Sequence, residues 1–558
     1  MPWVSMPGTQ IKFPPFFDSN IVVTRTFCID LLRRLTKSFR AMRKVFSLTL
    51  LFLGALTSGY AAGLNKHVVM VVWDGMRPDF INGTNTPTLY ELAHRGVFFA
   101  HNHAVYITST EVNGTALATG AYPEHSGVIA NREFRPQIDP LVPFGTESLD
   151  AMRKADEQGR YLAVSTVALT LQHQGYRTAI AGTKPVVLLQ DHAERPENSA
   201  NVVLYEGHTL PDGLVTNFIH LLGPFADKGG TKTNRDIWTT RSLSELIWKK
   251  DVPQFSLLWL AEPDNTQHAT GVGSPESVAA IHNSDYALSR VVDQLKVHGV
   301  FDLTDIIVVS DHGFSTISRN VDLVALLRGA GFKAVREFTS APARGEVLVV
   351  GLGGSALIYV IDHDEKTIAG VVNFLQSQDF AGPIFTAHAR EGTFPLDDAM
   401  IHSTHAPDIV LSFGWNDDTN ANGFPGSVIS ESQGSNLNTG PGLKATHASL
   451  SPFDLHNTLA AAGPDFRQGF VDNMPTGNVD VAPTILKILG VKPAQHVDGR
   501  VLSEALNLSS TGSANIQTKD LHAQAKLPGG EWEQTLRVTE VDGVRYLEQG
   551  TGQFKISQ

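Results

Sequence analysis

Cysteine is almost absent from this chain, because Cys28 is the only one among 558 residues. A single thiol cannot form an intramolecular disulfide, so disulfides are excluded as a source of stability. A long apolar run is also missing near the N-terminus, where residues 45–56 form the longest one. These 12 residues are fewer than the roughly 20 that a membrane-spanning helix needs, so we expect no stable membrane span.

The short apolar run has the surroundings of a secretory signal. Arg43 and Lys44 precede it, and small residues follow it as far as Ala61 and Ala62. We therefore expect a leader over residues 1–62, with a signal peptide over 42–62 that is translated from Met42. The expected location of the mature protein is the periplasm or the extracellular medium.

Positive charge is scarce, since 44 Lys and Arg oppose 56 Asp and Glu and give a net charge of −12. The expected leader holds eight Lys or Arg and two Asp, a net +6, so the remaining chain carries −18. A protein this acidic is a poor partner for nucleic acid polymers. With 42% apolar and 18% charged residues, the composition is that of a globular protein.

Three continuous apolar runs, at 67–75, 255–264 and 305–313, end in a carboxylate beside a turn. Unbroken apolarity predicts parallel strands that are covered on both faces. The side chains that follow such strands meet at one edge of the sheet, which is where ligands bind in these folds. Asp74, Asp264 and Asp311 should therefore lie together.

Helical patterns alternate with these strands, notably at residues 85–96 and 275–299, which predicts an α/β fold. We expect one α/β domain over residues 63–510, with an insertion at about 320–445. The last strand and helix of this domain are expected at 478–491.

The expected insertion contains a hairpin pattern at 345–364 and a polar stretch at 416–442. Long polar stretches of this kind are either flexible or lids over a site. A tail over residues 511–558 follows the domain, and Asp542-Gly543 predicts the turn of a second hairpin there.

Histidines accompany two of the three carboxylates. His312 follows Asp311 directly, and His268 lies four residues after Asp264, on the same face of any helix that begins there. Carboxylate and imidazole together suit zinc and similar divalent ions. Surface salt bridges and helix caps are the alternative reading of the same pairs.

Ordered motifs in this chain resemble those of the alkaline phosphatase superfamily, and most closely its type I phosphodiesterase/nucleotide pyrophosphatase family. They are VVWDGMRPDF, TGAYPEHSGVIAN, EPDNTQH, VVSDHG and ATHAS. The resemblance covers residues 66–135 and 250–320 well, and 440–500 loosely. It implies a mostly parallel central sheet with helices on both faces and added insertions.

This resemblance implies a nucleophile at Thr110, ten residues before Gly120, with Thr108 and Ser109 as neighbours only. It also implies two divalent metal ions, with zinc expected, and a covalent phospho-Thr110 intermediate. One ion would be held by Asp74, Thr110, Asp311 and His312, and the other by Asp264, His268 and His447.

Substrate contacts follow from the same resemblance. Asn131 occupies the position of an asparagine that donates to a phosphoryl oxygen, and Asn113 is a second candidate. Lys184 follows another short apolar run and is either a contact for an anionic substrate group or an ordinary solvated lysine. His402 and His405 are rivals to His447 as the last ligand.

The chain departs from the family where Glu111-Val112-Asn113-Gly114 replaces the usual Phe-Pro-Asn-His after the nucleophile. A carboxylate thus stands where nucleotide-cleaving members present an aromatic ring. Because Glu111 repels negative charge, a singly charged phosphodiester is favoured as the small phosphate-ester substrate. The alternatives are a phosphomonoesterase or phosphonate hydrolase on the same scaffold, and a non-catalytic binding protein.

Overall fold

The computed structural model describes residues 66–157, 159–226, 232–431, 442–495, 497–507 and 514–556. The leader expected at 1–62, including its signal peptide, lies outside the described residues. Among the residues described, no helix is both long enough and apolar enough to cross a membrane.

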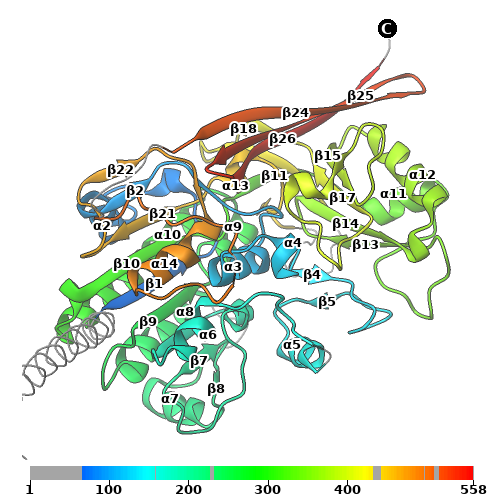
Figure 1. The fold of residues 1–558 in the computed structure, drawn as a ribbon. Coiled ribbons are helices and arrows are strands. Elements are labelled where there is room, and N and C mark those ends of the chain that lie inside the picture. The colour runs from blue at the N-terminus through cyan, green and yellow to red at the C-terminus, as the bar shows by residue number, and fades with distance from the viewer. Residues whose placement is uncertain are drawn as a thin grey trace, which may run out of the picture. The chain divides into compact units, whose positions relative to one another are not determined.

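A central sheet of nine strands organises the chain from residue 66 onward (Figure 1). Its five middle strands run parallel, and the strands at both sides include antiparallel neighbours. In spatial order the strands are β22 (Phe470–Asp472), β2 (Val97–Phe99), β21 (Leu459–Ala462), β10 (Thr304–Val309), β1 (His67–Trp73), β9 (Phe255–Leu260), β6 (Thr178–Gly182), β7 (Val202–Tyr205) and β8 (His208–Leu210).

Both faces of this sheet are buried under helices, as the unbroken apolar runs predicted. Val68, Met70 and Val72 of β1 pack on one face with α3 (Thr110–Thr119), α6 (Val167–His173) and α14 (Val481–Ile488). The alternate residues, such as Val69 and Val71, pack on the other face. The helices there are α2 (Pro87–Arg95), α8 (Lys232–Arg241) and α10 (Pro275–Val297). The fold is α/β, as expected.

A second sheet forms within the region expected to be an insertion. The expected hairpin is present as β13 and β14, which pair from Val347↔Val360 to Gly351↔Ala356. In order, the six strands are β12 (Ala334–Val335), β13 (Val347–Gly351), β14 (Ser355–Val360), β17 (Ile409–Phe413), β15 (Ala381–Thr386) and β16 (Phe394–Pro395). The helices α11 (Leu323–Gly329) and α12 (Glu365–Gln376) pack on it.

Much of the polar stretch at 416–442 is sheet rather than a free loop. β18 (Trp415–Thr419) and β19 (Pro425–Glu431) pair with each other, and β19 also pairs with β11 (Ser315–Val321). β20 (Ala445–Thr446) completes this four-stranded sheet. Residues 432–441 lie outside the described residues, so the expected lid is not tested there.

The C-terminal tail is a sheet of three strands, one more than the expected hairpin. They are β24 (Ile516–Leu527), β25 (Gly530–Val541) and β26 (Val544–Ile556), drawn in red in Figure 1. Asp542 and Gly543 form the expected turn, with φ of +51° and +93°. β26 lies beside β15 of the second sheet.

The expectation of a strand within residues 478–491 is wrong. Asn478–Asp480 is a helical turn that leads directly into α14. The Asp480 carboxylate accepts hydrogen bonds from the backbone N–H groups of Gly477 and Arg500, and this stabilises the start of the turn. Side-chain capping has therefore overridden the apolar pattern.

Candidate active site

Four neighbouring parallel strands, β10, β1, β9 and β6, deliver polar side chains to one edge of the central sheet. Asp74 directly follows β1, and Asp311 lies two residues after β10. Asp264 begins α9 (Asp264–Thr270) after β9, and Lys184 lies two residues after β6. The three carboxylates have no exposed surface, so the sheet gathers buried charge at this edge.

Thr110 is the first residue of α3, and Ser109 is its N-cap. Its Oγ1 lies 3.4 Å from His312 Nε2, next to the carboxylates. Thr108 differs, since its hydroxyl donates to the Ser449 carbonyl at 3.0 Å. The partial positive charge of a helix N-terminus favours a phosphoryl group at Thr110.

Lys184 joins two of the carboxylates. Its Nζ lies 2.9 Å from Asp74 Oδ2 and 2.7 Å from Asp264 Oδ2. The indole N–H of Trp259 donates to the same oxygen of Asp74 at 2.9 Å. One oxygen of each carboxylate is therefore fixed in place.

Asp311 is held in the same way, because its Oδ1 accepts from the backbone N–H groups of Gly75 at 2.9 Å and His312 at 3.0 Å. The second oxygen of each carboxylate has no such hydrogen bond. Within the described part of the chain, five buried site atoms have no hydrogen-bond partner. They are Asp74 Oδ1, Asp264 Oδ1, Asp311 Oδ2, His268 Nε2 and His447 Nε2.

The three site histidines present the same nitrogen to this space. Each Nδ1 donates to a backbone carbonyl, which can only accept, so each neutral imidazole has its lone pair on Nε2. Such a carbonyl contact is the usual orienting partner of a metal-binding histidine. The contacts are His268 to Ala445 at 2.8 Å, His312 to Gly313 at 2.9 Å and His447 to Thr108 at 2.9 Å.

The atoms without partners face one another or His312 Nε2. His312 Nε2 lies 3.6 Å from Asp74 Oδ1 and 3.3 Å from Asp311 Oδ2. Asp264 Oδ1 lies 3.2 Å from His268 Nε2 and 3.6 Å from His447 Nε2. With bonds of about 2.0–2.2 Å, the ligands of a tetrahedral zinc ion are roughly 3.4 Å apart, so the donor set fits such an ion.

At this edge of the sheet, two groups of side chains could hold a metal ion by the spacing of their ligand atoms. The first, Asp74 with Asp311 and His312, agrees with the expected first ligand set apart from Thr110. The second joins Asp264 and His447 with His312, where His268 was expected. His312 therefore lies between the two groups, and its ring stacks on that of His447 with centroids 3.7 Å apart.

The site holds more buried negative charge than Lys184 alone can neutralise. Burial, followed by the charge of Asp311, raises the pKa of Asp74 well above its usual range. Burial would also raise the pKa of Asp264, but Lys184 and then His268 outweigh it and hold that pKa well below its usual range. One lysine cannot neutralise three buried carboxylates, whereas divalent cations can.

The two asparagines expected to contact the substrate differ in which side-chain groups are available to bind it. The Asn131 side-chain oxygen accepts the backbone N–H of Glu111 at 3.3 Å, so its N–H₂ is the group that could meet a phosphoryl oxygen. Asn113 is fully buried, and its amide bonds to both backbone groups of Val105 and to Asn478. These bonds hold the chain before Thr110, so we leave Asn113 out of the substrate contacts.

The rivals to His447 lie elsewhere. His402 bonds through Nδ1 to Asp397 at 2.9 Å, and His405 lies 3.4 Å from Gln137. Burial, followed by Arg135, lowers the pKa of His405 to about 4. Neither is among the groups of ligand atoms found in the described residues.

Trp259 and Gly75 were missed by sequence reasoning. The only signal for Trp259 is a side chain with an N–H donor near the end of a fully buried strand. Glu147 was missed as well, because nothing in the sequence ties it to Glu111. Burial, followed by the charge and hydrogen bond of Glu147, raises the pKa of Glu111 well above its usual range.

We expect Gly75→Ala to disrupt this site. Gly75 has φ +72°, and an added Cβ would lie 2.9 Å from Phe314 Cδ2 and 3.1 Å from Asp264 Cβ. The substitution should lower the free energy of unfolding by about 2–4 kcal/mol and reduce kcat/KM, as measured by urea unfolding and ester hydrolysis. Gly127→Ala is the matched control, since its φ is +88° but nothing lies within 4 Å. Equal losses in both variants would contradict this explanation.

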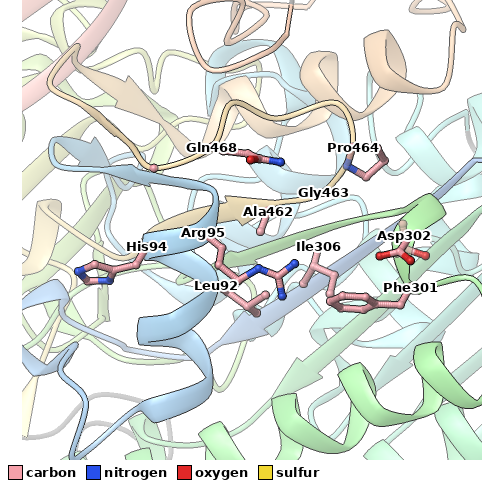
Figure 2. A pocket seen from close by; sticks show the side chains of 12 residues that line it. Leu92, His94, Arg95, Phe301, Asp302, Ile306, Ala462, Gly463, Pro464 and Gln468 are labelled. Carbon is pink, nitrogen blue, oxygen red and sulfur yellow. The ribbon is translucent and has the colours of Figure 1, made fainter.

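A cavity of about 580 Å³ lies at the other end of β10, away from these residues (Figure 2). It reaches Thr304, the first residue of that strand, and Ala462, the last residue of antiparallel β21. Its main cation, Arg95, lies over the ring of Phe301 at 5.6 Å. The cavity contains none of the expected catalytic residues.

Comparison with known proteins gives one family. Residues 68–417 match the profile described as type I phosphodiesterase/nucleotide pyrophosphatase. The chain is 24% identical over 486 residues to mouse ectonucleotide pyrophosphatase/phosphodiesterase family member 7, covering 86% of this chain and 95% of that protein. It is also 24% identical to mouse bis(5'-adenosyl)-triphosphatase enpp4, over 81% of this chain and 84% of that one.

The solved structure of murine ectonucleotide pyrophosphatase/phosphodiesterase 5 has the same fold. It matches with a TM-score of 0.56 and 18% identity, over 79% of this chain and all of that one. An inactive threonine-to-alanine variant of that enzyme, solved in complex with AMP, matches equally well. The chain belongs to the type I phosphodiesterase/nucleotide pyrophosphatase family and is a hydrolase with its alkaline-phosphatase-like fold.

Proposed function

We propose that this protein hydrolyses small phosphodiesters or pyrophosphates with two divalent ions, expected to be zinc, and with Thr110 as the nucleophile. The observation that carries the proposal is the set of five buried ligand atoms without hydrogen-bond partners, which lie in the two groups around His312, the residue that Thr110 contacts. Export and the leader at 1–62 remain part of the proposal, as does the catalytic domain at 63–510.

Asp74, Asp311 and His312 would hold one ion, and Asp264, His268 and His447 the other, with His312 close to both groups. Bound zinc supplies positive charge that favours the deprotonated hydroxyl and neutralises the phosphoryl group. Lys184 and Trp259 keep the two aspartates in position, and the carbonyl contacts keep each Nε2 lone pair available.

The chain's own residues then account for the reaction. Thr110 Oγ1 loses its proton to water and forms the new P–O bond while the bond to the leaving oxygen breaks. The leaving oxygen takes up a proton from water, and the first product departs as an alcohol or a phosphate. The N-terminus of α3 and the Asn131 N–H₂ stabilise charge on the phosphoryl oxygens. Water then cleaves the phospho-Thr110 ester and releases the second product.

The charges near Thr110 favour a diester. Lys184 is engaged by Asp74 and Asp264, and the Glu111–Glu147 pair adds no positive charge beside the nucleophile. Nothing among these residues would neutralise the second charge of a monoester. One relative is named as a bis(5'-adenosyl)-triphosphatase, and this extends the proposed class to nucleotide substrates.

The proposal is tested by the ratio of kcat/KM for bis(4-nitrophenyl) phosphate to that for 4-nitrophenyl phosphate, with zinc present. Thr110→Ala serves as the blank. We expect a ratio well above one. A ratio well below one would contradict the diesterase assignment and support a phosphomonoesterase on the same scaffold.

We expect Lys184→Met to lower kcat/KM and zinc affinity by about 10–100-fold, the usual cost of losing a group that orients metal ligands. The long apolar side chain keeps the packing but releases Asp74 and Asp264. Activity at several zinc concentrations measures the effect, and exposed Lys249→Met is the control. An unchanged zinc dependence would show that Lys184 does not position the aspartates.

A further inference from the structure

A second cluster of ligand atoms shares no residue with the site described above. His103 lies on β3 (Asn102–His103), His456 caps α13 (Pro452–Leu455), and Glu548 lies on β26. Their ligand atoms lie within 4.8 Å of one another. The cluster thus joins three distant parts of the sequence, one of which is the C-terminal sheet.

Both imidazoles approach the same carboxylate oxygen. Glu548 Oε2 lies 3.1 Å from His103 Nε2 and 3.2 Å from His456 Nε2. Charge-assisted N–H···O contacts are usually shorter, at about 2.7–2.9 Å. The edges of a tetrahedral zinc site with nitrogen and oxygen ligands are roughly 3.3–3.4 Å, so the observed spacings lie between those of the two kinds of contact.

The tautomer of His103 supports a cation at this point. Its Nδ1 donates to the Thr476 carbonyl at 2.8 Å, so neutral His103 turns the lone pair of Nε2 toward Glu548. Two lone pairs that face each other at 3.1 Å repel unless a proton or a metal ion lies between them. His103 is 2% exposed, so little water can separate its Nε2 from Glu548.

His456 points to the same conclusion. Its ring lies beside that of His103, with centroids 4.6 Å apart, and its Nε2 lies 3.2 Å from the same oxygen of Glu548. The two rings and the carboxylate thus bring three ligand atoms to one point. One divalent cation satisfies both nitrogens and the carboxylate without protonating either ring.

We propose that His103, His456 and Glu548 form a zinc site, separate from the catalytic centre, that ties the C-terminal sheet to the α/β domain. The side chains of His456 and Glu548 are 30% and 20% exposed, so the ion can enter from solvent and keep a water as its fourth ligand. Since one ligand comes from β26, the bound ion stabilises the docking of that strand.

Zinc content per chain, measured by mass spectrometry after equilibration with micromolar zinc, tests the site directly. We expect wild type to retain about one more ion than His456→Ala or Glu548→Gln. Exposed His101→Ala, two residues before His103, is the matched control and should retain the wild-type content. Equal zinc content in wild type and both variants would overturn the proposal.

Thermal unfolding gives a second readout that does not depend on the catalytic proposal. Added zinc should raise the Tm of wild type by a few degrees more than it raises the Tm of Glu548→Gln. Because Glu548→Gln keeps the side-chain volume, this test still applies if His456→Ala folds poorly. Diester hydrolysis should be preserved in Glu548→Gln. An equal rise in Tm in both proteins would contradict a structural ion at Glu548.

Discussion

Replacing Thr110 with alanine should abolish turnover, with kcat/KM falling by about 10⁴-fold or more, because the only proposed nucleophile is lost. Folding should be little affected. The hydroxyl makes one contact of 3.4 Å, to His312, and an alanine fits the first position of α3. Diester hydrolysis measures the first effect and urea unfolding the second.

Thr108→Ala is the matched control for this prediction. It removes a neighbouring hydroxyl that donates to Ser449, so it should lower the free energy of unfolding by about 1 kcal/mol and kcat/KM by less than about 10-fold. If Thr108→Ala lost activity and Thr110→Ala retained it, the assignment of the nucleophile would be wrong.

Loss of a metal ligand should have the second-largest effect. Asp264→Asn replaces a carboxylate whose Oδ1 faces His268 and His447, and it should lower kcat/KM by at least about 10³-fold. A chelator should likewise inactivate the wild type, and added zinc should restore it. Metal content measured beside activity shows whether the two fall together.

Asp305→Asn is the control for that variant. Asp305 is a buried carboxylate at the start of β10, where burial and Asp465 raise its pKa to about 8. A neutral amide should therefore be tolerated there, with activity and metal content close to wild type. Chelator-resistant activity, or equal losses in Asp305→Asn and Asp264→Asn, would contradict a metal-dependent mechanism.

The strands that carry the site could be predicted because their apolar runs are unbroken and each ends in a carboxylate. Parallel pairing of β10, β1 and β9 then brings Asp311, Asp74 and Asp264 to one edge. The comparisons with known proteins confirm the predicted α/β fold and the predicted family.

Other features depend on contacts that no local pattern reveals. The bridge from Lys184 to Asp74 and Asp264 joins three strands, and the position of His312 between the two ligand groups depends on its stacking with His447. The polar stretch before residue 432 resembles a loop in composition, yet it pairs as β18 and β19 because β11 offers a sheet edge.

The most direct test of the mechanism is the stereochemical course at phosphorus. A phosphorothioate diester of known configuration would be hydrolysed in ¹⁸O-labelled water, and the configuration of the product determined. Attack by Thr110 followed by attack of water inverts phosphorus twice, so the account predicts net retention. Net inversion would mean that water attacks the substrate directly, and it would contradict a covalent phospho-Thr110 intermediate.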